Sequence, residues 1–418
     1  SGPLAGDALS FFVNGRYIYF DGWLHGFRRF QPSNIASTDS TGQYQLFRDS
    51  ATRGDLAEVP MNSSERVYGQ GKLTWKISPA LKLTGNYTYN HEVSKAYNPM
   101  YYYNPDGIGS NYNVSNTWIF QLSHSLNSNL FYTLGASIFN KDFKYYLYEN
   151  PHDPRYVHPK LFTTSDLYSF FTGGTDLNRF HRSTNTSLAK IDLSDQISQT
   201  HLIKVGMEAR QHRIFFESLQ LQPIAAQSDI DLAHASPFIT TQILDVSSLS
   251  HDLYEHRPNE FSGYVQDKME FKDLIVNIGM RFDYFEPDGN VLIDESDPDI
   301  NDPIKPSNIF HDLNGNGSQD PGELTKTVDE RRAYWFRKAS SKVQFSPRFG
   351  ASFPITAGGV VHFSYGHFFQ IKYNYQNINL KQKQMKHSTL LSKTPNNKIV
   401  EGRCIPLLFA ILFLVSGA

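Results

Sequence analysis

The chain has 418 residues, and its 39 basic and 41 acidic residues leave a formal net charge of −2. This near balance supplies no positive field for phosphates, so the composition argues against nucleic acid as a partner. Aromatic residues make up 14% of a chain that is only 39% hydrophobic, which suits the aromatic girdles of a transmembrane barrel better than a soluble core.

Segments in which apolar and polar residues alternate follow one another along most of the chain. Successive side chains of a strand point to opposite faces, so alternation with a period of two predicts strands. We expect eleven strands, over residues 9–21, 64–77, 81–90, 114–126, 130–146, 182–197, 201–216, 261–271, 274–284, 342–355 and 360–371.

The clearest pair of strands lies at residues 261–284, where Lys272 and Asp273 form the turn. In the second strand the apolar row comprises Leu274, Val276, Ile278, Met280, Phe282 and Tyr284. A tilted strand needs about 9–11 residues to cross a membrane, and this run is long enough. We therefore expect one face of the sheet to meet lipid and the other face to be wet.

Connections between the expected strands alternate strictly in length. Short turns are predicted at residues 78–80, 127–129, 198–200, 272–273 and 356–359, and long segments at 22–63, 91–113, 148–181, 218–257 and 287–341. Outer-membrane barrels have short periplasmic turns and long extracellular loops. The predicted fold is therefore all-β, an antiparallel transmembrane β-barrel. Bacterial barrels close with an even number of strands, so about eleven strands predict a partial barrel.

The sequence changes character after residue 371. Residues 372–398 are polar without alternation, and residues 404–418 form an apolar run that is too short for a transmembrane helix of about 20 residues. We expect residues 1–371 to be the partial barrel and residues 372–418 to be an unassigned tail without a twelfth strand, produced by truncation or a frameshift. A short C-terminal anchor is the alternative. The opening SGPLAG contains no signal peptide, which favours a mature piece or an internal fragment.

A candidate calcium loop lies within the longest connection, at DLNGNGSQDPGE (residues 312–323). Oxygen-bearing side chains stand at loop positions 1, 3, 5, 7, 9 and 12, namely Asp312, Asn314, Asn316, Ser318, Asp320 and Glu323. Gly317 stands at position 6, as the calcium-loop pattern requires. Pro321 and the lack of a flanking helical pattern predict a calcium-clamped loop rather than a helix-flanked sensor. The nearby acids Asp294, Asp297, Asp299 and Asp302 could add ligands or be solvated charges, and the sequence favours solvated charges.

Other motifs are weaker. Tyr101, Tyr102 and Tyr103 could stack on a sugar or a planar ligand, or could pack within a loop or an interfacial girdle. The single cysteine, Cys404, excludes an intrachain disulfide and a cysteine metal cluster. The histidines are scattered, and we find no nucleophile, acid–base pair or phosphate-binding loop, so an enzyme is the least favoured class.

Three stretches resemble the barrel region of TonB-dependent outer-membrane receptors, in particular the Bacteroidetes-like type with an N-terminal carboxypeptidase-regulatory-like domain. They are LSFFVNGRYIYFDG (9–22), YVQDKMEFKDLIVNIGMRFDYFEPDG (264–289) and SPRFGASFPITAGGVVHFSYGHFFQ (346–370). The resemblance covers residues 8–371 and implies half of a 22-stranded barrel, a class whose lumen is plugged. It also implies a location in the bacterial outer membrane, contact with its lipid and, in the full-length protein, a TonB complex as partner.

The sequence departs from that family because it contains no plug, no TonB box and no second half of a barrel. We expect a receptor fragment whose parent takes up a scarce nutrient such as an iron chelate, an oligosaccharide or a peptide. The ligand residues stay unknown, and the only expected cofactor is calcium in the loop at 312–323. The alternatives are a passive porin-like barrel, which needs a twelfth strand, and a surface β-rich adhesin, which would dissolve without detergent.

Overall fold

The computed structural model describes residues 1–38, 41, 44–162, 170–229, 231, 236–246, 248, 250–356, 359–370 and 403–414. Its long strands are β2 (Leu9–Phe20), β7 (Ser64–Ser78), β8 (Leu81–Ser94), β9 (Ser110–Ser125), β10 (Leu130–Tyr146), β11 (Asn178–Gln196), β12 (His201–Gln220), β16 (Asn259–Phe271), β17 (Leu274–Glu286), β20 (Lys342–Thr356), β21 (Gly359–Gln370) and β22 (Arg403–Leu414).

Shorter elements lie in the connections. The short strands are β1 (Gly2–Ala5), β3 (His25–Phe27), β4 (Ser37–Thr38), β5 (Tyr44–Gln45), β6 (Glu58–Pro60), β13 (Gln222–Pro223), β14 (Thr241–Gln242), β15 (His251–His256), β18 (Asn290–Leu292) and β19 (Phe336–Lys338). The helices are α1 (Pro306–Ile309) and α2 (Val328–Trp335). None of the helices in the described ranges is long and apolar enough to cross a bilayer.

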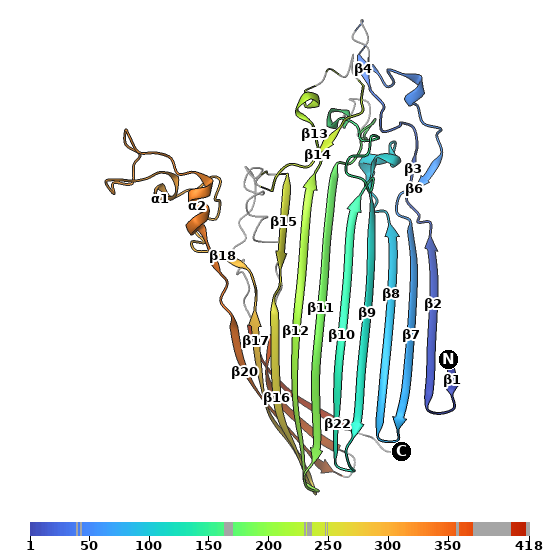
Figure 1. The fold of residues 1–418 in the computed structure, drawn as a ribbon, viewed down its shortest axis with the longest axis vertical. Coiled ribbons are helices and arrows are strands. Elements are labelled where there is room, and N and C mark those ends of the chain that lie inside the picture. The colour runs from blue at the N-terminus through green and yellow to red at the C-terminus, as the bar shows by residue number, and fades with distance from the viewer. Residues whose placement is uncertain are drawn as a thin grey trace. The chain divides into compact units, whose positions relative to one another are not determined.

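One large sheet contains all the long strands (Figure 1). Its hydrogen-bonded order is β1-β2-β7-β8-β9-β10-β11-β12-β16-β17-β20-β21-β22, and β15 pairs with β12. Neighbours in this order are also neighbours along the chain of long strands, and every pairing with a described register in this sheet is antiparallel. This is the meander of an up-and-down barrel, so the predicted all-β antiparallel architecture is confirmed.

All eleven predicted strands are present, and most of them extend further toward the long loops than the alternation indicated. For example, β9 begins at Ser110 and β12 ends at Gln220. The residues at these ends are mostly polar or aromatic on both faces, so they carry little periodic signal. Backbone pairing with the neighbouring strand continues beyond the point where burial imposes a pattern.

The expectation that no twelfth strand follows residue 371 was wrong. Strand β22 pairs with β21 in an antiparallel register that runs from Gly359↔Leu414 to Gln370↔Arg403. Its sequence, RCIPLLFAILFL, is apolar at nearly every position, so it lacks the period of two on which the prediction depended. Backbone hydrogen bonds form regardless of that period. Residues 371–402 lie outside the described residues, and the tail boundary at 371 stays a prediction.

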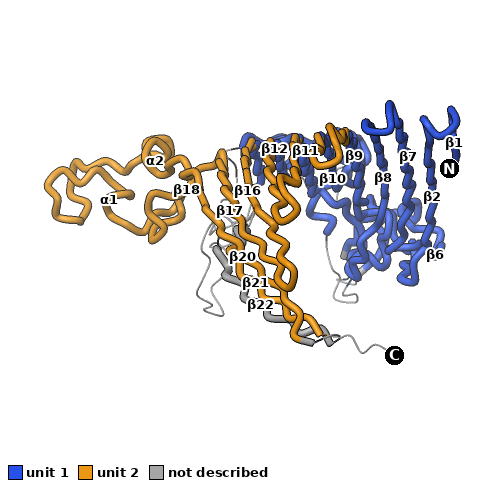
Figure 2. Tube along the Cα trace, turned by 90° about the horizontal axis from the view of Figure 1, so that it is seen from below, with its two compact units in different colours: residues 1–121, 136–187, 213–255 blue, residues 122–135, 188–212, 256–418 orange. Residues whose placement is uncertain are grey.

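The chain divides into two compact units, which are drawn in different colours in Figure 2. Unit 1 comprises residues 1–121, 136–187 and 213–255, and unit 2 comprises residues 122–135, 188–212 and 256–418. In unit 1 the small hydrophobic cores lie in the long loops, around Tyr156, Val157 and Met61. In unit 2 the excursion between β17 and β20 carries both α-helices and the β18–β19 pair.

The sheet has an apolar face and a polar face in each unit. In unit 2 the register of β16 with β17 aligns Val265 with Met280 on one face, and Tyr264 with Arg281 on the other. The apolar side chains are exposed, as Val265 and Ile278 illustrate at 50% and 49%. In unit 1 the same alternation exposes Val13, Leu73 and other apolar residues of β2 and β7. A face of exposed large apolar side chains needs a nonaqueous partner.

Candidate functional site

The polar face of unit 2 carries a row of interacting charged and polar side chains on β11, β12, β16 and β17. The Tyr264 hydroxyl donates to Asp192 Oδ1 at 2.9 Å, across the intervening strand β12. Gly206 lies opposite Tyr264 in the register, and a Cβ there would stand 2.2 Å from the tyrosine ring. The absence of a side chain at Gly206 therefore lets the ring lie across β12 and reach Asp192.

Further toward the long loops, Glu260 joins two basic side chains of β12. Its carboxylate lies 3.6 Å from Arg210 and 3.4 Å from His212, and Arg210 also pairs with Glu208 at 2.7 Å. Arg281 pairs with Asp283 at 2.8 Å on the next strand, β17. Every cation in this row has a carboxylate beside it, which keeps the charges compensated on a partly buried surface.

A hollow of about 270 Å³ lies beside this row, at the β16–β17–β20–β21 strands. Its lining includes Gln266, Asn277, Arg348 and Ser364. The glycines of the neighbouring strands, such as Gly279 and Gly350, leave the space that larger side chains would fill. Alternation places these polar residues on one face of the predicted strands. It does not show which strands are neighbours, so it does not bring the residues together as a site.

The long loops of unit 1 fold onto one another. We call the described residues of segments 21–63, 95–109, 147–177 and 221–250 the loop layer. Main-chain hydrogen bonds link them, including Phe30 N to Tyr103 O at 3.0 Å and Ile239 N to Tyr156 O at 3.0 Å. Arg28 adds an ionic link, because its guanidinium pairs with Asp106 at 2.5 Å and Asp55 at 3.0 Å. The Arg28 pKa is raised, chiefly by the hydrogen bond to Asp106.

Two buried asparagines connect distant loops through their side-chain amides. Asn34 Nδ2 donates to Thr172 O at 2.7 Å, and Asn104 Nδ2 donates to Gly174 O at 2.8 Å. Both asparagines are fully buried. Because buried carbonyl groups need a donor, these two amides fix the loop at 170–177 against the loops that precede it.

The aromatic run at Tyr101–Tyr103 packs within the loop layer. Tyr101 is buried, and its ring lies edge-on to Phe171 at 5.0 Å. Tyr102 lies edge-on to Phe27 at 5.6 Å. Burial raises the pKa of the Tyr101 hydroxyl well above its usual range. Of the two expectations for this run, loop packing is the one that these contacts support, since a stacked ligand would need the Tyr101 ring face to be open.

The candidate calcium loop is a compact turn. One carboxylate oxygen of Asp312 accepts from Gly315 N at 2.6 Å and the other accepts from Gly317 N at 2.9 Å. Gly315 and Gly317 both have a φ of +74°, a conformation that favours glycine. Asp320 Oδ2 accepts from the side-chain amides of Asn314 and Asn316 at 2.6 and 2.7 Å. The six predicted ligand residues thus surround one turn.

Two expectations about this region were wrong. Helices α1 and α2 do flank the loop, although α1 has only four residues and was too short to give a periodic pattern. Asp297 is fully buried rather than solvated, and it accepts from Ile304 N and Lys305 N at 2.9 and 3.0 Å. The pKa of Asp294 is lowered to about 2, chiefly by its hydrogen bond to Lys305. Within the described ranges, His, Cys, Asp and Glu side chains form no cluster of three or more that could hold a metal ion.

A comparison with protein-family models gives one match, to an outer membrane beta barrel domain, over residues 39–404. The chain belongs to this family. The match covers most of the chain and runs beyond residue 371. An outer membrane beta barrel lies in the bacterial outer membrane, and its apolar face meets lipid. The exposed apolar face of the sheet thereby has its nonaqueous partner.

Solved structures of outer-membrane proteins are similar to this barrel chain at low sequence identity. The alcaligin outer membrane receptor FauA from Bordetella pertussis is 11% identical with a TM-score of 0.43, and the match covers 76% of this chain and 37% of that one. The ferric-catecholate import receptor Fiu from E. coli K12 is 13% identical with a TM-score of 0.44, covering 94% and 49%. The copper transporter OprC is 7% identical with a TM-score of 0.45, covering 88% and 47%.

The barrel chain therefore spans less than half the length of each of these three proteins. A search of curated protein sequences gave no significant match.

Proposed function

We propose that this barrel chain is part of a TonB-dependent receptor that takes up a scarce nutrient, such as an iron chelate, an oligosaccharide or a peptide. The observation that carries the proposal is the folded loop layer, in which Arg28, Asn34 and Asn104 tie together loops from three different connections. A loop layer of fixed geometry lowers the entropy cost of ordering the loops around a ligand. The three sequence stretches that resemble such receptors support the same function.

The polar face supports a protein partner inside the barrel. Carboxylates and cations alternate along it at Glu208, Arg210, Glu260 and Arg281. The side chains of such a surface can leave their ion pairs within the sheet and form ion pairs with a plug domain. Each charge then still has a partner of opposite sign. In this proposal the TonB complex acts through that plug in the full-length protein, and this chain supplies wall and loops without catalytic chemistry.

Uptake measurements test the proposal. Cells with and without the gene, each with and without a functional TonB complex, are supplied with labelled iron chelates, oligosaccharides and peptides. We expect uptake of one class to require both the gene and TonB. Uptake that requires the gene but continues at the same rate without TonB would contradict the receptor function.

Strand β22 favours one alternative, a passive porin-like barrel. It brings the long strands, those of twelve or more residues, to twelve in the described part of the chain. An even number permits closure. In the described hydrogen-bonded order, however, β1 and β22 are the two ends of the sheet rather than partners. Stable open conductance of the purified protein in a planar bilayer would favour the porin, and a blocked lumen would favour the receptor.

We also propose that the loop at 312–323 binds calcium. Its donors are all oxygens, as a hard cation prefers. A half-turn of the Asn314 and Asn316 amides would place their oxygens where their nitrogens now face Asp320. Glu323 is buried, and its two carboxylate oxygens accept from Leu313 N at 2.8 Å and from Asp320 N at 3.0 Å. These bonds close the loop. Each oxygen keeps a lone pair that could bind the cation.

Calcium is expected to protect the connection at 287–341 from protease, because bound oxygen ligands hold the loop in one conformation. Asp312→Asn should weaken the protection about tenfold or more in calcium concentration, since a charged ligand is lost. Asp329→Asn is the matched control, because Asp329 is exposed on α2 and pairs only with Arg332 among the described residues. Equal cleavage of the unmodified protein in calcium and in chelator would remove the calcium site.

A further inference from the structure

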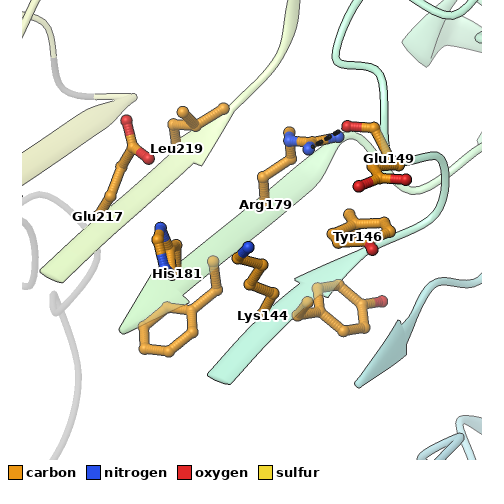
Figure 3. Close-up of a pocket in the computed structure, with 9 residues that line it drawn as sticks. Lys144, Tyr146, Glu149, Arg179, His181, Glu217 and Leu219 are labelled. Atoms are coloured by element: carbon orange, nitrogen blue, oxygen red, sulfur yellow. Dashed lines mark hydrogen bonds between the residues drawn. The ribbon is translucent and has the colours of Figure 1, made fainter. Parts of the chain in front are cut away.

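An open hollow of about 260 Å³ lies in unit 1 where β10, β11 and β12 meet their long loops (Figure 3). Its lining includes Lys144 and Tyr146 of β10, Arg179 and His181 of β11, and Glu217 of β12. The close-up shows these side chains rising from three neighbouring strands. The lining of this hollow shares no residue with the polar row of unit 2 or with the candidate calcium loop.

Contacts between neighbouring strands place this hollow on the apolar face of the sheet. The Tyr146 ring stacks on Tyr112 of β9 at 4.3 Å. Along β9, the residues on the same side as Tyr112 include Trp118, which is 44% exposed and packs on Tyr87 at 4.2 Å. Asn140 of β10 donates to Asn116 at 3.0 Å between these two levels, so the alternation is continuous.

The hollow therefore continues the lipid-facing surface. On that face, exposed apolar residues such as Trp118 and Ile138 are followed toward the long loops by the amides of Asn116 and Asn140, then by the tyrosine pair and the charged groups. A membrane protein typically shows this same order, with apolar residues in the hydrocarbon, aromatic residues at the interface and cations among the headgroups. The charged groups thus stand at headgroup level, on the side of the long loops.

Most carboxylates near the hollow already have basic partners. Asp142 lies 2.6 Å from His181 and 3.2 Å from Lys144, and Glu217 lies 3.2 Å from His251. The His251 ring also contacts Leu244 O through Nδ1 at 2.7 Å. The His251 ring thus lies between a carbonyl and the Glu217 carboxylate, so Glu217 already has a basic partner.

Arg179 is different, because carbonyls hold it rather than a carboxylate. Its guanidinium donates to Tyr148 O at 2.6 Å and Glu149 O at 2.7 Å, and lies over the Tyr146 ring at 5.1 Å. In the part of the chain that the structure describes, no carboxylate lies within ion-pair distance of it. Neutral acceptors fix the position of the guanidinium without cancelling its charge, so a preorganised cation faces the headgroup region.

We infer that this hollow binds the phosphate of an outer-leaflet lipid headgroup, through Arg179 and Lys144. Arginine and lysine both form charge-assisted hydrogen bonds with phosphate oxygens. The volume suits one phosphate with part of a sugar. Continuity with the lipid-facing surface selects a lipid as the source, because its acyl chains would lie along the exposed apolar side chains while its phosphate reaches the cations.

Binding of phosphorylated lipid A, dephosphorylated lipid A and inorganic phosphate to the purified protein in detergent tests this inference. Retained lipid is counted by native mass spectrometry and affinity is measured by titration. We expect phosphorylated lipid A to bind and the dephosphorylated form to bind about tenfold more weakly, as expected for a lost charge-assisted contact. Equal binding of both lipids, or displacement of the lipid by millimolar inorganic phosphate, would overturn the lipid assignment.

Three variants separate the charge of the hollow from its structural role. Lys144→Gln should weaken binding about tenfold, whereas Lys141→Gln should leave it unchanged, because Lys141 is exposed on the opposite face of β10. Glu149→Gln removes an exposed carboxylate from the rim and should strengthen binding. These variants leave Arg179 in place, because Arg179 also holds the loop carbonyls of Tyr148 and Glu149. An unchanged affinity in both Lys144→Gln and Glu149→Gln would exclude a phosphate in this hollow.

Discussion

Gly54→Ala is expected to destabilise the loop layer of unit 1 by about 3 kcal/mol, near the upper end of the cost of overpacking. A Cβ at Gly54 would stand only 1.9 Å from the carbonyl oxygen of Arg28. This carbonyl oxygen also accepts a hydrogen bond from Leu56 N at 3.0 Å. Because it is a backbone atom, it cannot rotate away as a side chain would. The two segments must separate, and the link from Arg28 to Asp106 is strained with them.

Hydrogen exchange of the loop amides and limited proteolysis in detergent measure this effect. Faster exchange should spread through residues 24–61 and reach the partners of Arg28, while the strands β7 and β8 keep their protection. Gly69→Ala is the matched control, because nothing lies within 4 Å of a Cβ at Gly69. Alanine there also reduces the freedom of the unfolded chain. If the loop amides were equally protected from exchange in the two variants, Gly54 would not lie as close to Arg28 as the structure places it.

Asn34→Ala is expected to cost about 3 kcal/mol, because each buried partner left unsatisfied costs about 1–3 kcal/mol. The side-chain amide donates to Leu46 O and Thr172 O at 3.0 and 2.7 Å, and its oxygen accepts from Thr52 Oγ1 at 2.9 Å. Asn34→Asp should be worse than alanine, since a carboxylate would face the two carbonyls. The loop at 170–177 should become accessible to protease in both variants.

The matched control is Asn14→Ala, because Asn14 is exposed on the polar face of β2. Loss of the Asn14 side-chain amide should leave the backbone amides of the loops as protected from exchange as in the unmodified protein. A denaturant titration that follows loop exchange gives the free energies of local opening, and the expected order of stability is Asn14→Ala, then Asn34→Ala, then Asn34→Asp. Protection of residues 170–177 that survives in Asn34→Asp would show that other contacts hold this loop.

The hairpins were predictable from sequence because each depends on local information. The pair β16–β17 shows this, since alternation fixed its two faces and Lys272-Asp273 fixed its turn. Shifting the register by one residue would place the Leu274 row on the wet face, so the pattern specifies the pairing. Strand β22 was not predictable in this way, because its twelve residues do not alternate between apolar and polar. Without alternation, neither a buried face nor a strand could be assigned from sequence.

The candidate sites differed in the same way. The candidate calcium loop could be proposed from sequence because its six predicted ligand residues lie within twelve consecutive positions. The loop layer could not, because Asn34 and its acceptor Thr172 are 138 residues apart. Nothing near Asn34 in the sequence distinguishes it from the many solvent-exposed asparagines of the chain.

By itself, the sequence determined eleven of the twelve described long strands, their alternating faces, the rhythm of short turns and long loops, and so the barrel architecture in an outer membrane. These follow from side-chain periodicity and turn chemistry, which act over a few residues. Tertiary structure alone decided that Tyr101 is buried among the loops, that Glu260 meets Arg210 and His212 of β12, and that backbone carbonyls hold Arg179. Such contacts depend on which strands and loops become neighbours, and residues far apart in the sequence carry no local signal of that.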